Sequence, residues 1–129
     1  MIKTILIVDD SRIARMMLNS CILQYQAYEI FEAEDGKKAI EKYKEVSPEV
    51  VFMDLTMPVL NGYEATREIL KINKNAIVFV ITADVQPKSV EIITDIGALA
   101  VIKKPAEPES VRNALIKAEE TLVLRAQSA

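Results

Sequence analysis

The feature that most constrains this chain is a set of short apolar runs, rich in valine, isoleucine and leucine, that recur every 22 to 27 residues. The runs are residues 4–8, 28–33, 50–53, 77–81 and 99–102. Because they are continuously apolar rather than alternating, they predict strands that are buried on both faces, which is typical of a parallel sheet. A sheet of this kind needs helices on each face to cover it.

The stretches between and after the runs carry helical periodicity, and each predicts an amphipathic helix lying on the sheet. Pro87 near the start of the fourth helix and Gly97 just past its end are typical helix boundaries. The apolar positions that define the five helices are Ile13, Met16, Met17 and Cys21; Ala39, Ile40 and Tyr43; Thr66, Ile69 and Leu70; Val85, Ile92, Ile93 and Ile96; and Val111, Ala114, Leu115, Ala118 and Leu122. Five strands alternating with five helices predict a doubly wound α/β domain, for which we assume the strand order 2-1-3-4-5.

Length and composition predict one globular domain with an ample core. The chain has 129 residues, of which 50% are hydrophobic and 27% charged, and this length leaves no room for a second domain. We expect the domain to occupy residues 1–122, with a short C-terminal tail at residues 123–129. The apolar stretches are far shorter than the roughly 20 residues needed to cross a bilayer, and no signal peptide pattern begins the sequence. We therefore expect a cytoplasmic protein with no membrane partner.

Charge and residue usage exclude several kinds of function. The formal net charge of −3 argues against a nucleic-acid partner, because phosphates require a basic face. The chain contains no histidine, which excludes the usual zinc sites, Ser-His triads and phosphohistidine chemistry on this chain. The single cysteine, Cys21, cannot form an internal disulfide, and its place on an apolar stripe predicts a buried free thiol.

Polar and charged side chains stand where four of the predicted strands end. Asp9 and Asp10 follow the first run, Asp54 follows the third, the fourth stops at Thr82, and the fifth passes into Lys104. Ligands of doubly wound sheets bind outside the carboxyl ends of the strands, and in the assumed order the switch point lies between strands 1 and 3. Three carboxylates in one crevice repel one another, so the site must either take up protons or hold a cation.

A hard divalent cation such as Mg²⁺ suits this ligand set, and it also binds phosphate oxygens. Thr82 and Lys104 would then stabilise the charge of a phosphoryl group during transfer, and Asp54 would be the nucleophile that forms an acyl phosphate. Each residue alone is also an ordinary member of a solvated loop, and Asp10 or Ser11 could simply N-cap the first helix. Their joint placement at the ends of four strands favours a functional site.

Four motifs in this order carry a family resemblance. They are Ile7-Val8-Asp9-Asp10-Ser11; Met53-Asp54-Leu55-Thr56-Met57-Pro58 with Asn61-Gly62; Ile81-Thr82-Ala83; and Gly97-Ala98 followed by Lys104-Pro105. With these motifs the chain resembles a response-regulator receiver domain of the single-domain, chemotaxis type (CheY-like), over essentially its whole length from Ile2 to about Thr121. The resemblance implies a flavodoxin-like fold, with a five-stranded parallel sheet and five helices.

The resemblance also implies a phosphoacceptor site. Asp54 would accept a phosphoryl group from the phosphohistidine of a sensor histidine kinase or phosphotransfer protein, in a Mg²⁺-dependent reaction. Asp10 and Asp54 would bind the metal directly, the backbone carbonyl of Thr56 would be a third ligand, and Asp9 would act through water or as a second carboxylate. The chain would not be an enzyme in the usual sense, because it would catalyse only its own phosphorylation and autodephosphorylation.

Further roles follow from the same resemblance. Thr82 and Lys104 would contact the phosphoryl oxygens, and we expect the Lys104-Pro105 peptide bond to be cis. Thr56 and Asp84 would flank the path of an attacking water. Val101 stands where many such receivers have an aromatic switch residue in the fifth strand, so we do not expect switching by a ring here.

The chain would pass on its signal by binding a downstream protein target through its surface. A phosphatase is a possible further partner. Three roles stay open: a chemotaxis regulator, a phosphate sink, and a relay to a second histidine protein. In another class, a haloacid-dehalogenase-like phosphohydrolase also uses an aspartyl nucleophile, but it has Asp-x-Asp after strand 1, whereas Asp9 and Asp10 are adjacent. The turn after strand 1 also lacks the glycine-rich loop of nucleotide or flavin sites. A receiver-like scaffold that is never phosphorylated would normally lack Asp54 or Lys104.

Overall fold

The structure, a computed structural model, describes residues 1–57 and 59–128, so Pro58 and Ala129 lie outside the described residues. Five strands form one parallel sheet in the order β2-β1-β3-β4-β5, which confirms the expected topology. The strands are β1 (Thr4–Val8), β2 (Glu29–Ala33), β3 (Val50–Asp54), β4 (Val78–Thr82) and β5 (Ala100–Lys103). The helices are α1 (Arg12–Tyr25), α2 (Gly36–Val46), α3 (Gly62–Ile72), α4 (Pro87–Ile96) and α5 (Pro108–Ser128).

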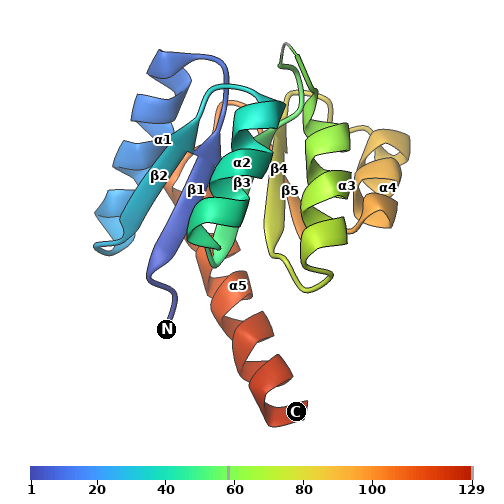
Figure 1. Ribbon diagram of the computed structural model, residues 1–129. Helices are drawn as coiled ribbons and strands as arrows, with labels where there is room; N and C mark the ends of the chain where they lie inside the picture. The colour runs from blue at the N-terminus through green and yellow to red at the C-terminus, as the bar shows by residue number, and fades with distance from the viewer. Residues whose placement is uncertain (58, 129) are drawn as a thin grey trace.

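The sheet is the middle of three layers (Figure 1). Helices α1 and α5 pack on one face, and α2, α3 and α4 pack on the other. Successive residues of a strand point to opposite faces of the sheet. Phe52 of β3 and Phe79 of β4 lie in the core on the α1/α5 side, where their rings stack with centroids 5.6 Å apart. The next residues, Met53 and Val80, lie in the core on the other face. This arrangement explains why the inner strands read as continuous apolar runs.

The two edge strands differ from the three inner ones. In β3 and β4 all five residues are buried, and in β1 only the first is not. Strand β2 instead exposes Glu29 and Glu32, and β5 is only partly covered. We expected all five runs to be buried on both faces, and this holds for the three inner strands. The edge strands β2 and β5 are more exposed, because each has a neighbouring strand on one side alone.

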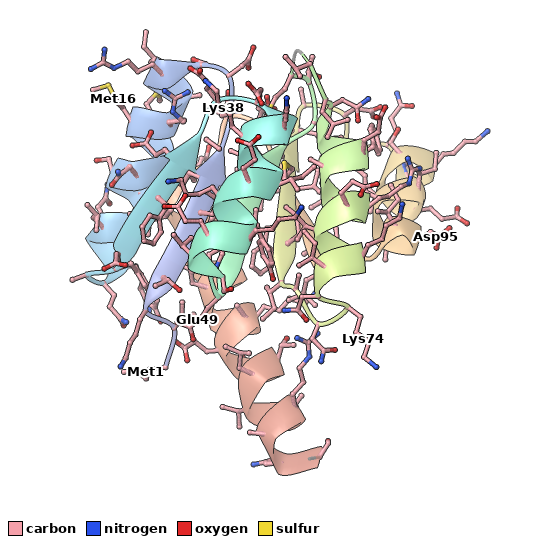
Figure 2. The ribbon with its side chains drawn as sticks, in the orientation of Figure 1. Met1, Met16, Lys38, Glu49, Lys74 and Asp95 are labelled. Atoms are coloured by element: carbon pink, nitrogen blue, oxygen red, sulfur yellow. The ribbon has the colours of Figure 1, made fainter. Side chains whose placement is uncertain are left out.

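The buried face of α1 is not the one that the sequence pattern indicated. Leu18, Cys21 and Ile22 are buried, whereas Ile13, Met16 and Met17 are 70%, 62% and 57% exposed. With 3.6 residues per turn, Met16 lies on the side of the helix opposite to Leu18, and Figure 2 shows it pointing away from the sheet. The prediction of Cys21 as a buried free thiol is correct.

The other helices follow the expected spacing more closely. Ala39, Tyr43 and Ile69 are buried on α2 and α3, and the expected stripe of α5 lies in the core. Of the four positions expected to define the fourth helix, Ile93 alone is fully buried and Ile92 is exposed; Val85, also exposed, lies before α4 begins at Pro87.

Helix α5 extends beyond the body of the domain, at the end of the sheet opposite to the carboxyl ends of the strands (Figure 1). The boundary that we expected after residue 122 falls inside this helix, so residues 123–128 form its last turns. One guanidinium nitrogen of Arg125 donates to the carbonyl of Asn75 at 2.6 Å, which ties these turns to the loop before β4. Among the described helices, none combines the length and the apolar character needed to cross a membrane.

Candidate phosphoryl and metal site

The predicted site residues lie at one edge of the sheet. Asp9 comes directly after β1, Asp54 is the last residue of β3, Thr82 is the last residue of β4, and Lys104 comes directly after β5. Strands β1 and β3 are neighbours, with Val8 opposite Met53, so the residues that follow them lie side by side. The parallel order of the strands therefore brings these distant parts of the sequence together.

Three carboxylates form a cluster at this edge. One oxygen from each of Asp9, Asp10 and Asp54 lies within 4.8 Å of the other two. Asp9 and Asp54 are only 6% and 3% exposed, while Asp10 is open to solvent. Buried acids at such distances need a positive charge beside them.

Lys104 supplies one such charge. Its Nζ lies 2.6 Å from Oδ1 of Asp54 and 3.8 Å from Oδ2 of Asp9. Burial lowers the pKa of Lys104, but the hydrogen bond and charge of Asp54, with smaller effects of Asp9 and Asp10, raise the pKa above its ordinary value. The ammonium is thus held in its charged form against the proposed acceptor. The Lys104-Pro105 peptide bond is cis, as expected.

The surroundings of Asp9 disfavour the charged form of its carboxyl group. Burial raises its pKa, a hydrogen bond from the backbone N–H of Ser11 at 2.9 Å lowers it, and Asp54 raises it again, so the net change is upward. The Ser11 hydroxyl also accepts from the backbone N–H of Ala14, which identifies Ser11 as the N-cap of α1.

Arg15 is a supporting residue that the sequence did not reveal. Its guanidinium donates to the Asp9 carbonyl at 2.7 Å and forms an ion pair with Glu32 at 2.8 Å. It therefore fixes the backbone at Asp9 from the first turn of α1. The sequence around Arg15 does not indicate these contacts, because they arise only when β2, which carries Glu32, lies beside β1.

Two other predicted residues are near the cluster, and their roles stay predictions. The buried Thr82 hydroxyl accepts a hydrogen bond from the backbone N–H of Asp84 at 3.1 Å. Thr56 lies two residues past Asp54 with an exposed side chain. Val101 is opposite Val80 in the sheet and packs against the α2/α3/α4 core, so β5 presents a short aliphatic side chain at that position.

Gly62, the first residue of α3, closes the loop after β3. Its backbone N–H donates to the Leu55 carbonyl at 2.9 Å, and the Asn61 side chain caps the helix by accepting from the backbone N–H of Glu64 at 3.0 Å. A Cβ atom on Gly62 would collide with the backbone carbonyl of Asp54. The absence of a side chain is what lets α3 begin against the end of β3.

The donor set at this edge fits Mg²⁺. Hard divalent cations take oxygen ligands, mainly carboxylates, carbonyls and water, and the cluster offers two buried carboxylates and an exposed one. The exposed side of Asp10 leaves room for the waters that Mg²⁺ retains. Lys104 already lies beside Asp54. An incoming anion such as a phosphoryl group would therefore meet two positive charges, the Lys104 ammonium and the Mg²⁺ ion.

Comparison with known proteins agrees with this reading. The family model described as the response regulator receiver domain matches residues 5–116. The chain belongs to the response-regulator receiver family. Receiver domains are a signalling family, and the match includes β2 to β5, all of β1 after Thr4, and the whole carboxylate cluster.

Among individual receivers, the chain is 45% identical to the chemotaxis protein CheY of Thermotoga maritima, over 89% of this chain and 96% of that protein. It is 38% identical to the chemotaxis protein CheY of Bacillus subtilis, over 91% and 98%. Among solved structures, the CheX-CheY-BeF3-Mg complex of Borrelia burgdorferi matches with a TM-score of 0.85 and 30% identity, over 89% of this chain and 87% of that chain. The chain is therefore a CheY-like receiver of two-component signalling.

Proposed function

We propose that this receiver accepts a phosphoryl group on Asp54 from the phosphohistidine of a sensor histidine kinase or phosphotransfer protein, in a Mg²⁺-dependent reaction. The observation that carries the proposal is the pairing of a nearly buried carboxylate with Lys104 at 2.6 Å, inside a cluster of three acids. The donor histidine has to come from another protein, because this chain has none.

Each residue has a defined part in this reaction. An Asp54 oxygen attacks the phosphorus in line with the leaving imidazole. Asp10, Asp54 and the Thr56 carbonyl would hold Mg²⁺, with Asp9 acting through water or as a further carboxylate, and the ion would neutralise charge on the phosphoryl oxygens. Lys104 and the Thr82 hydroxyl bind these oxygens as well, which stabilises the charge that develops in transfer.

A cavity beside the acceptor supports the approach of a donor side chain. It has a volume of about 270 Å³ and lies between α1 and the segment after β5. Its lining is mainly apolar, with Asp9 and Lys104 at its polar side; the apolar members are Ala14, Met17, Leu18, Ile81, Pro105 and Ala106. We propose that the donor side chain approaches Asp54 through this cavity, past Asp9 and Lys104.

The biological output that we propose is phosphorylation-dependent binding of a protein target in the cytoplasm, of the chemotaxis or motility kind. The CheY relatives support this output, and the protein would catalyse only its own phosphorylation and autodephosphorylation. A protein of the CheX kind, as in the Borrelia complex, is a candidate partner.

The test of the phosphoacceptor is a mass measurement. Wild type and Asp54→Ala are incubated with acetyl phosphate, with and without Mg²⁺, and their intact masses are compared. We expect the wild type to gain one phosphoryl group when both acetyl phosphate and Mg²⁺ are present. We expect no gain without Mg²⁺ and none in Asp54→Ala. An equal gain in Asp54→Ala, or no gain in the wild type under conditions that label a control receiver, would refute the proposal.

The kind of output is tested separately, by binding. A pull-down is performed with and without beryllofluoride, a stable mimic of the phosphoryl group. A regulator of the chemotaxis kind should retain a partner that prefers the activated form, a phosphate sink should retain none, and a relay should transfer its label to a histidine protein.

A further inference from the structure

The carboxylate of Asp84, two residues past the end of β4, is bound to the start of α4. Its Oδ1 accepts a hydrogen bond from the backbone N–H of Gln86 at 3.1 Å, and its Oδ2 accepts one from the Ser89 hydroxyl at 2.7 Å. The backbone N–H of Asp84 in turn donates to Oγ1 of Thr82 at 3.1 Å. Asp84 therefore connects the last residue of β4 to the first turn of α4.

Within the part of the chain that the structure describes, the start of α4 has no other side-chain cap. The N-cap residue Gln86 makes no side-chain hydrogen bond, and Pro87 in the first turn has no N–H to donate. The hydrogen bond from Ser89, and after it the one from Gln86, lower the pKa of Asp84, so the side chain is an anion at neutral pH. An anion at the amino end of a helix is also favoured by the helix dipole.

The position of this anion matters because of Thr82. The Thr82 hydroxyl is the group that we propose to bind a phosphoryl oxygen, and it accepts a hydrogen bond from the backbone N–H of Asp84, whose carboxylate is therefore anchored two residues along the chain from the site. Asp84 is also open to solvent, in a surface pocket lined by residues 83–86 and Lys103. A carboxylate that is free at such a place can orient an attacking water and take its proton, which is the role of a general base.

We propose that Ser89 is a positioning residue of the phosphoryl site, whose hydroxyl holds the Asp84 carboxylate on α4 and so prevents it from promoting hydrolysis of the Asp54 acyl phosphate. This inference rests on the proposed function. In the hydrolysis, the water oxygen bonds to phosphorus, the bond between phosphorus and the Asp54 oxygen breaks, the water proton passes to the base, and inorganic phosphate leaves. Ser89 thereby lengthens the life of the phosphorylated state.

The experiment follows the loss of the phosphoryl group in five proteins. Wild type, Ser89→Ala, Ser89→Thr, Asp84→Asn and the double variant Ser89→Ala with Asp84→Asn are labelled with acetyl phosphate and Mg²⁺. The donor is then removed, and the intact mass is followed with time. We expect Ser89→Ala to lose the group at least about threefold faster than the wild type, since a freed carboxylate can act as a base. Ser89→Thr, which keeps the hydroxyl, should behave as the wild type does.

The double variant separates positioning from a role in helix stability. If Ser89 acts through the Asp84 charge, the change to alanine has no further effect in the Asp84→Asn background. An equal acceleration in both backgrounds, or an unchanged lifetime in Ser89→Ala, overturns the inference. A wild type that cannot be labelled refutes the proposed function and this inference together, whereas a labelled wild type with unchanged variant lifetimes refutes this inference alone.

Discussion

The environment of Asp9 opposes the charge of its own side chain. The residue is buried beside Asp54, and its pKa is raised first by burial, although Ser11 and Lys104 act in the other direction. A buried acid with a raised pKa destabilises the folded state at every pH at which it is charged. Such a cost is expected at a site that has been built to hold a cation.

Replacement of this acid by its amide tests the cost. Without Mg²⁺, we expect Asp9→Asn to raise the free energy of unfolding at pH 7 by about 0.5–2 kcal/mol. Because the folded-state pKa is the higher one, the gain should shrink as the pH falls toward the ordinary value of 3.8, where Asp9 of the wild type becomes neutral.

Urea denaturation at several pH values measures this effect. The matched control is Asp10→Asn, at the exposed neighbour, for which a smaller gain is expected. A lower stability of Asp9→Asn at pH 7 would contradict the argument.

The residues of the site differ in how far they could be predicted. Asp9, Asp54, Thr82 and Lys104 follow apolar runs directly, and parallel strands place their carboxyl ends at one edge, so pattern alone indicated that they would be close. Arg15 could not be found in this way, since its contacts depend on the neighbouring positions of α1, β1 and β2. The Ser89 contact likewise depends on how the loop before α4 turns.

At the scale of elements, α1 shows why periodicity identifies a helix more surely than its buried face. Apolar residues stand on two sides of this helix, and the sequence pattern indicated the side with Ile13, Met16 and Met17. The sheet and α5 cover only the side with Leu18, Cys21 and Ile22. The strand order and the helix positions were predictable because each run is short, apolar and regularly spaced.

Two isoleucines of α1 provide a matched pair of variants. Ile22 is fully buried and Ile13 is 70% exposed, in the same helix. We expect Ile22→Ala to lower the free energy of unfolding by about 2–5 kcal/mol, because it leaves a cavity in the core. Ile13→Ala should change it by no more than about 0.5 kcal/mol.

Chemical denaturation of the two variants under identical conditions measures the difference. Similar losses in both would mean that Ile13 is also packed, as the sequence pattern indicated. A small loss in Ile22→Ala would mean that α1 does not lie on the sheet by this face.

For the whole molecule, the carboxylate cluster joins β1 to β3 in the middle of the sheet, so a cation held there should stabilise the entire domain. A ligand that binds only the folded state adds stability by mass action, which is about 1.4 kcal/mol at ten times its dissociation constant. We expect Mg²⁺ to raise the thermal unfolding temperature of the wild type with this concentration dependence.

The same titration of Asp54→Asn should give a much smaller rise, because the variant lacks one of the buried ligands. Asp95→Asn, at an exposed acid near the end of α4 and outside the cluster (Figure 2 shows its position), should respond as the wild type does. An equal response in all three proteins would indicate general ionic effects rather than binding at this site.

Gly62 constrains the site through its backbone alone. It has no functional group and takes no part in the transfer of a phosphoryl group, yet a single added methyl group would press against the carbonyl of the acceptor residue. Either α3 or the end of β3 would have to move. We therefore expect few substitutions to be tolerated at Gly62, although it reacts with nothing, and a screen of substitutions for retained folding should find this position nearly as restrictive as a buried core residue.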